Sequence, residues 1–235
     1  MKKQLGAVVA GAAMVVLVPA AAQAVVVADW EMDESAGATV MVDSVGNHNG
    51  NINSVATGVN GLVGDGGAAY QFDGVTSWVD IPDPDGTLNP GSADMTITAT
   101  VKVEDATMTD DSYEVIRKGL VTSKGGDWKM EIKRKGTDAT VGKLHCVFKG
   151  VLPNGTNSLA GVSAAKDIVD GQVHKLQCVR TSTGVQAIVD DGLSVGKLTK
   201  ASGNIANAVY PLIGSKVQGD DVMQGVIDQV KIDIG

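Results

Sequence analysis

The sequence predicts an all-β protein that folds as one antiparallel sandwich of two sheets. Short segments alternate apolar and polar residues, as strands with a single buried face do. Thirty glycines are spread along the 235 residues without a collagen-like period and supply many tight turns. Long helical patterns are absent, and aromatic residues make up only 3% of the chain. The core must therefore be built mainly from Val, Ile, Leu, Met and Ala.

The N-terminus has the layout of a secretory signal peptide. Lys2 and Lys3 precede an uncharged, mostly apolar run from Leu5 to Val18, and small residues up to Ala24 follow. A retained membrane anchor would need about 20 apolar residues, whereas this run has about 14. We therefore predict a signal peptide over residues 1–24, cleavage after Ala24, and a secreted or extracytoplasmic protein that is not inserted in the membrane after cleavage.

The remaining residues, 25–235, suit a single β-sandwich domain. Loss of Lys2 and Lys3 from 19 basic residues leaves 17, against 27 acidic ones, so the net charge falls from −8 to −10. Nucleic acid and anionic membranes are poor partners at such a charge.

The first half of this domain reads as strands that are separated by polar turns. Val25 to Met32 is a β-branched strand, which the turn Asp33 to Gly37 and a second short strand, Ala38 to Val42, follow. Asp43 to Asn53 is a loop rich in Asn, Gly and Asp. Gly67 to Pro82 alternates on both sides of Asp73-Gly74, and this pattern predicts a β-hairpin.

Alternation continues through the second half. Between Met95 and Val103 every second residue is apolar, so one face of this strand belongs to the core. Asp190-Asp-Gly192 is a further hairpin turn signal. The other expected strands are Glu114 to Lys118, Asp127 to Arg134, Lys143 to Lys149, Gln172 to Thr181, Val185 to Asp190, Tyr210 to Gly214 and Val222 to Ile234.

Two cysteines, Cys146 and Cys178, remain after export. An even number of cysteines in an exported protein favours a disulfide, and two buried reduced thiols are the alternative. A bridge would close a loop of about 32 residues, worth on the order of 3 to 4 kcal/mol in the chain-entropy model.

Several segments carry a family resemblance. Asp29 to Gly37, Asp43 to Gly50 and Gly67 to Pro82, in this order, resemble the opening of laminin-G-like jelly rolls, which belong to the concanavalin A-like lectin/glucanase superfamily. The middle and the end of the chain look like exported actinobacterial members of that group, through the segments Lys118 to Leu120, Gly125 to Ile132, Cys146 to Gly150, Asp170 to Cys178, Val189 to Gly192 and Gly225 to Ile232.

The resemblance covers nearly all of residues 26–234. It implies a jelly-roll fold and a bridge between the two cysteines. The chain departs from the family motif at Val173, where a Trp usually precedes the histidine.

Catalytic patterns are weak. Glucanases of this superfamily carry Glu-x-Asp-x-(x)-Glu on one strand, and Glu31-Met-Asp33-Glu34 is superficially similar. Glu34 would point away from the other two carboxylates, however, and already belongs to the turn. A lyase would need a Tyr or His base, but His48, His145 and His174 fit structural roles better. We predict no catalytic residue.

Calcium is the most plausible ion, because exported jelly rolls often hold it with carboxylates and backbone carbonyls, and three carboxylates are its candidate ligands. Asp228 alternates with Val226, Val230 and Ile232, which places it on an apolar face, where a carboxylate must be paired, hydrogen-bonded or bound to metal. Asp73 at its Asp-Gly turn and Asp43 at the start of its loop are the others. Hydrogen bonds from backbone amides are the alternative role for all three.

Sugar binding would need an aromatic plate that is flanked by Asn, Asp or Gln. Trp128 and Trp78 are the candidate plates, whereas Trp30 belongs to the core. We predict a non-catalytic binding module for polysaccharide or for a cell-surface partner. A glycoside hydrolase or polysaccharide lyase of the same fold and a structural envelope protein are the alternatives.

Overall fold

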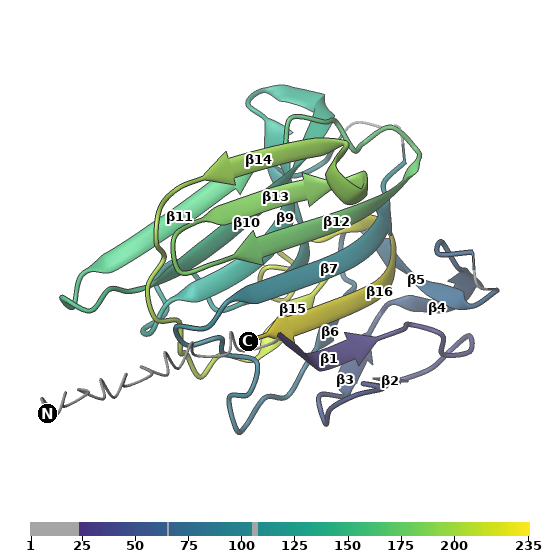
Figure 1. The fold of residues 1–235 in the computed structure, drawn as a ribbon. Helices are drawn as coiled ribbons and strands as arrows, with labels where there is room; N and C mark the ends of the chain where they lie inside the picture. Colours follow the sequence, from purple (N-terminus) through teal and green to yellow (C-terminus); the bar gives the residue numbers. More distant parts are fainter. Residues whose placement is uncertain (1–23, 65, 105–107) are drawn as a thin grey trace, which may run out of the picture.

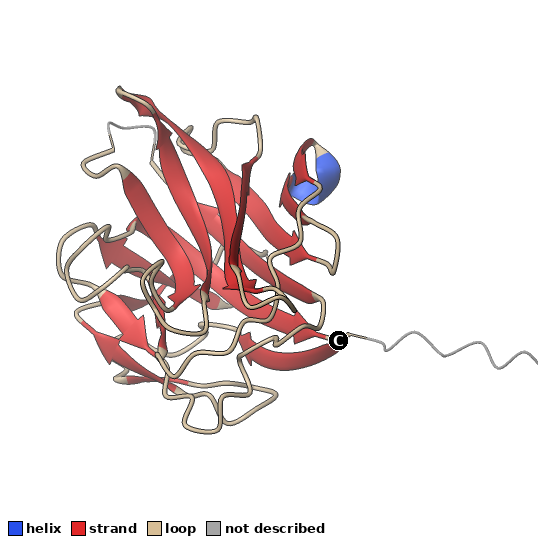
Figure 2. Ribbon diagram, turned by 90° about the vertical axis from the view of Figure 1, so that its left-hand side faces the viewer, coloured by secondary structure: helices blue, strands red, loops and turns tan. Residues whose placement is uncertain are grey.

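The computed structural model describes residues 24–64, 66–104 and 108–235, and it shows two antiparallel sheets that are packed face to face (Figure 1). Apart from Ala24, the predicted signal peptide lies outside the described residues. Figure 2 shows that strands make up almost all of the regular structure, with one short 3₁₀ turn, η1 (Asp190–Gly192). The predicted all-β class is confirmed.

The first sheet has eight strands. Seven of them follow one another in the order β14 (Ser194–Leu198), β13 (Val185–Val189), β12 (Val173–Arg180), β7 (Met95–Lys102), β16 (Gln224–Ile234), β5 (Ala68–Asp73) and β4 (Ala56–Asn60). The eighth, β1 (Val25–Trp30), pairs with the later half of β16, whereas β5 pairs with its earlier half. The C-terminal strand therefore joins three partners in the middle of this sheet.

The second sheet also has eight strands. Their order is β11 (Asn157–Ser163), β10 (Asp138–Val151), β9 (Asp127–Lys135), β8 (Ser112–Lys118), β15 (Pro211–Ile213), β6 (Trp78–Asp80), β3 (Gly50–Asn53) and β2 (Val40–Met41). β3, β4, β11 and β14 have no counterpart among the predicted strands, because their Gly, Ser and Asn residues interrupt the apolar alternation.

The core lies between the two sheets. On β7 the inward residues Met95, Ile97, Ala99 and Val101 are fully buried, as the alternation predicts. The same cluster contains aromatic rings from both sheets: Trp30 and Phe72 from the first, and Phe148 from the second. The few large aromatic side chains of this chain are thus concentrated where apolar burial stabilises the fold most.

The predicted hairpin at Asp73-Gly74 is wrong. β5 belongs to the first sheet and β6 to the second, so the turn is a corner that carries the chain across the sandwich. The Asp73 carboxylate accepts hydrogen bonds from the backbone N–H groups of Val75, Thr76 and Ser77, and these bonds close the corner. An Asp-Gly pair favours a tight turn both in a hairpin and at a corner between sheets. The pairing of β5 with β4 and β16 places β5 in the first sheet, apart from β6. The second Asp-Gly signal is confirmed, because η1 joins the antiparallel neighbours β13 and β14.

A disulfide connects the two sheets. Cys146 on β10 and Cys178 on β12 are bonded, with a Cα–Cα distance of 5.5 Å, and both are fully buried. The predicted bridge is therefore confirmed. The covalent bond joins strands from opposite layers and so restrains the separation of the sheets directly.

Replacing both cysteines, as in Cys146→Ala with Cys178→Ala, should lower the free energy of unfolding by about 3 to 4 kcal/mol, because the unfolded chain loses its covalent loop. Urea unfolding measures the change. Reductant should destabilise the wild-type chain and leave the double variant unaffected. A wild-type chain that reductant does not destabilise would contradict this role.

Candidate functional site

A groove of about 410 Å³ lies on the outer face of the second sheet. Its floor comes from β8, β9 and β10, and its walls include Leu120 and Val121 on one side and Leu159 of β11 on another. The remaining lining residues are mostly polar: Arg117, Thr122, Asp127, Lys129, Glu131, Lys133, His145, Val147, Lys216 and Asp221.

Strand alternation places these polar side chains in the groove. On β9, Trp128, Met130 and Ile132 are fully buried in the core, so the residues between them must face outward. Cross-strand pairing then aligns the outward residues in rows. One row runs from Glu114 through Glu131 and His145 to Ser163, across β8, β9, β10 and β11.

Ion pairs connect the floor of the groove. Arg117 Nη1 lies 2.8 Å from Glu114 Oε1, and Lys129 Nζ lies 3.6 Å from the same oxygen. Lys129 Nζ is also 2.5 Å from Glu131 Oε2. Glu114 and Glu131 are 0% and 2% exposed. Two neighbouring carboxylates thus share one lysine beneath the groove, and Arg117 balances the deeper of them.

Burial dominates the electrostatics of this floor. It raises the pKa of Glu114 above the ordinary range of a carboxyl, and the adjacent Arg117 and Lys129 cations limit the rise. Burial also raises the pKa of Asp127 and lowers that of His145. Glu114 Oε2 and Asp127 Oδ1 are buried, and the described residues offer neither of them a hydrogen-bond partner. Perturbed carboxyls that gather in one groove are typical of functional sites.

A half-buried Trp78 lies on the same outer face, on β6. Asn53 is directly opposite Trp78 on β3, and Asn51 and Asn53 donate hydrogen bonds of 2.8 and 3.1 Å to the carboxylate of Asp80. On β15, Leu212 pairs with Asp80 on one side and with Arg117 on the other. The aromatic patch, defined as Trp78, Asn51, Asn53 and Asp80, therefore continues across one strand into the groove.

Comparison with known proteins identifies the family of this sandwich. The family model of the concanavalin A-like lectin/glucanases superfamily, Laminin_G_3, matches residues 73–233, well over half of the chain. The chain belongs to this superfamily. No curated protein matches it significantly.

Solved structures share the superfamily fold at low sequence identity. Domain 4 of AbnA, an extracellular arabinanase from Geobacillus stearothermophilus in complex with arabinotriose, is 18% identical with a TM-score of 0.60, over 91% of this chain and 94% of that domain. The binding domain of botulinum neurotoxin serotype D is 10% identical, with a TM-score of 0.57. Trypanosoma rangeli sialidase in complex with sialic acid is 13% identical, with a TM-score of 0.53.

The last two comparisons concern larger chains. This chain is covered to 88% in each, but it corresponds to only 47% of the toxin domain and 30% of the sialidase. All three likenesses establish the concanavalin A-like jelly roll. Within the described residues, no helix has the length and apolar character that a membrane span requires.

The prediction that Trp128 is a plate for sugar binding is wrong. Its side chain is 0% exposed, and Nε1 donates a 3.1 Å hydrogen bond to the carbonyl of Leu88. It is an inward residue of β9 and therefore a core residue of this superfamily fold, as Trp30 is. Trp30 is fully buried as predicted and donates to the carbonyl of His48.

The three predicted calcium ligands lie on different segments. Asp43 accepts the backbone N–H groups of Asp29, Val45 and His48, and Asp73 holds the corner described above. None of the three belongs to the one group of potential metal-ligand atoms found in the described part of the chain. A common calcium site formed by these carboxylates is therefore not supported.

Asp228 is buried, but not on the face that alternation predicts. A β-bulge between Asp228 and Val230, with Gln229 at φ 48°, shifts the register. Ile227 and Val230 consequently face the core, and Asp228 lies on the outer side of the sheet, 1% exposed. Its Oδ2 accepts the N–H groups of Leu62 and Val63, at 2.6 and 3.2 Å, and so fastens a loop over β16.

The histidines and the Glu31–Glu34 segment behave mainly as structural groups. His174 is 3% exposed between two carboxylates, each 2.9 Å from one ring nitrogen: Asp170 and Asp190. Glu34 accepts the N–H of Val42 in its turn. His145, by contrast, lines the groove.

Sequence reasoning missed Glu114, Arg117, Asp127, Lys129 and Glu131 as site residues. Their signal is the regular spacing of charges on β9, where Asp127, Lys129, Glu131 and Lys133 alternate with core residues. Alternation indicates that such residues face outward. The walls that enclose them come from loops that are distant in sequence, and alternation does not predict these.

Asp73 should make stability depend on acid pH. Burial alone would raise its pKa, but N–H and O–H donors from Thr76, Val75 and Ser77 outweigh burial and hold the pKa well below the ordinary value of about 3.9. The stabilisation is therefore present above that value and is lost as the pH falls below it. Asp73→Asn should flatten the fall in unfolding free energy between about pH 5 and pH 2.

Urea unfolding over a pH series measures this slope. Glu31→Gln, which removes an exposed carboxylate elsewhere, is the control and should leave the slope unchanged. Equal slopes in Asp73→Asn and the wild-type chain would count against the corner as the origin.

Calcium binding by Asp228 stays a prediction. If a calcium ion is held there, millimolar calcium should raise the melting temperature, chelator should reverse the rise, and Asp228→Asn should abolish it. Differential scanning calorimetry provides the measurement. A wild-type melting temperature that neither calcium nor chelator changes would refute calcium at this position.

Proposed function

We propose that this protein is an exported, non-catalytic module that binds polysaccharide across the outer face of its second sheet. The observation that carries the proposal is the continuity of the aromatic patch with the groove through Leu212. This face combines an indole surface, amide and carboxylate groups, and a recess with charged groups in its floor. An extended ligand could contact all of these at once.

A saccharide is the ligand class that suits this combination. Sugar rings have apolar faces that pack on aromatic rings, and their hydroxyl groups pair with amides and carboxylates. Asn51, Asn53 and Asp80 supply such groups beside Trp78. The complex of the similar arabinanase domain with arabinotriose supports the same class, because that domain is matched over 94% of its length.

The state of the two glutamates favours binding over catalysis. A glycosidase needs one carboxyl within reach of the leaving oxygen and another within reach of the anomeric carbon. Glu114 is fully buried beneath Arg117, and Glu131 is bound by Lys129. Both carboxyls are thus engaged by cations in this arrangement. Export is supported by the predicted signal peptide and by the disulfide, which is typical of oxidising compartments.

Trp78→Ala should weaken binding of the best polysaccharide ligand about tenfold, a loss of about 1.4 kcal/mol of contact energy. Lys133→Ala, which removes an exposed cation that lines the groove, should weaken it as well. Affinity electrophoresis in gels that contain one soluble polysaccharide each measures the dissociation constant. Leu193→Ala and Lys197→Ala, which remove an exposed apolar side chain and an exposed cation at β14 of the first sheet, are the controls and should bind normally.

The same panel separates the alternatives. Release of reducing ends or unsaturated products by the wild-type chain would indicate a glycan-cleaving enzyme. Absence of retardation with every neutral and acidic polysaccharide would contradict the binding proposal and favour a structural envelope role.

A further inference from the structure

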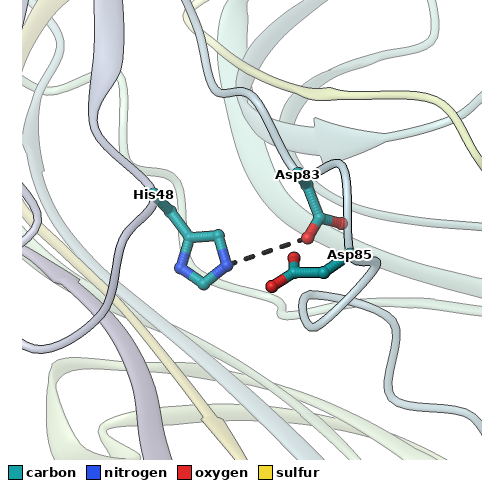
Figure 3. Close-up of side chains that lie close together, drawn as sticks. All are labelled: His48, Asp83 and Asp85. Carbon is teal, nitrogen blue, oxygen red and sulfur yellow. Dashed lines mark ion pairs between the residues drawn. The ribbon is translucent and has the colours of Figure 1, made fainter.

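His48, Asp83 and Asp85 converge at the junction of two loops, outside the groove and the aromatic patch (Figure 3). One ligand atom from each residue lies within 4.8 Å of the other two. His48 Nε2 is 3.7 Å from Asp83 Oδ1, the contact that is dashed in Figure 3. His48 comes from the loop between β2 and β3, and the two aspartates follow β6.

The imidazole of His48 is held in a fixed orientation. Nδ1 lies 3.1 Å from Asp43 Oδ2. The Asp43 carboxylate also accepts the backbone N–H groups of Asp29, Val45 and His48, which fix its position. With Nδ1 directed at Asp43, the other ring nitrogen, Nε2, faces Asp83 and Asp85. A carboxylate that orients a histidine in this way is the usual partner of a metal-binding imidazole.

The charges around the imidazole do not balance. Three carboxylates, Asp43, Asp83 and Asp85, meet one ammonium group, Lys118, whose Nζ is 2.6 Å from Asp83 Oδ2. An imidazole that binds a metal is neutral, so two negative charges then remain. The side chains of Asp43 and Asp83 are 0% exposed, so water screens these two charges poorly, whereas Asp85 is exposed. A divalent cation has the charge that the cluster lacks.

We propose that His48 Nε2, Asp83 Oδ1 and a carboxylate oxygen of Asp85 bind a divalent transition-metal ion, with Zn²⁺ as the representative. An imidazole with two carboxylates suits zinc better than calcium, which prefers six to eight oxygen ligands. Asp83 bridges the metal and Lys118 through its two oxygens, and Asp43 positions the imidazole from behind.

Thr87 marks the space that the ion would take. Its hydroxyl lies 2.6 Å from His48 Nε2 and 3.3 Å from Asp85 Oδ1. On metal binding the hydroxyl turns away from Nε2, and water completes the coordination. Such an ion would cross-link two loops that are 35 residues apart in sequence at their ligands His48 and Asp83, and would stabilise them without entering the groove.

Titration of the tag-free protein with Zn²⁺ tests the proposal. Isothermal titration calorimetry should give one ion per chain, and the melting temperature should rise with zinc and fall with chelator. Co²⁺ should give the visible absorption of a nitrogen-and-oxygen site. Asp85→Asn changes an exposed residue, so it should fold normally and weaken zinc affinity at least tenfold. Asp138→Asn, an exposed carboxylate on a hairpin elsewhere, should bind as the wild-type chain does.

Two results would overturn the site. One is the absence of saturable binding at one ion per chain in the wild-type protein. The other is unchanged affinity in both Asp85→Asn and His48→Gln, which would mean that zinc binds elsewhere on the acidic surface. Because Asp85→Asn leaves the buried residues intact, loss of folding in His48→Gln does not affect the test.

Discussion

The burial of one apolar face of each sheet against the other is the interaction on which the rest of the structure depends. The core between the sheets is built from alternate residues of strands such as β7 and β9. Since each strand residue points opposite to its neighbours, burial of one set forces the other set outward. The charges of the groove are therefore a consequence of the same pattern that makes the core, and a shift of one residue on β9 would bury Lys129 and Glu131 in place of Met130 and Ile132.

Several charged side chains on this outer face are shielded from water, and their loss of hydration costs free energy on folding. Removing a carboxylate such as Glu114 from water is unfavourable unless its partners compensate. Arg117 and Lys129 provide compensation at 2.8 and 3.6 Å. Because each of these ions is held by the others, the side chains of the groove floor are fixed in position before any ligand is present.

Carboxylates also stabilise the loops of this fold. Asp43, Asp73 and Asp228 each collect N–H groups of a nearby segment, and each fixes a loop, a corner or a covering segment. Lys118 and Asp83 form a fully buried pair that connects β8 with the loop after β6. The fold thus uses carboxylates as acceptors for backbone donors in places where regular pairing between strands stops.

Much of the fold could be predicted from the sequence, because alternation, turn residues and cysteine number are local or simple signals. Most strands from Met95 onward, the buried Trp30, the turn after β13 and the disulfide follow from them, whereas β11 and β14 do not. The pairing of strands cannot be read locally. Asp73-Gly74 specifies a tight turn, and only the partners of β5 and β6 decide that it is a corner between sheets.

The same division applies to the site residues. For Trp128 the alternation of β9 already indicates the buried side, whereas the bulge at Gln229 that turns Asp228 outward arises only when β16 pairs with β7. The groove and the cluster around His48 require loops that are distant in sequence to meet. The sequence by itself thus determined the class, most of the strands and the bridge. Tertiary structure decided which polar residues gather, because long-range packing positions them.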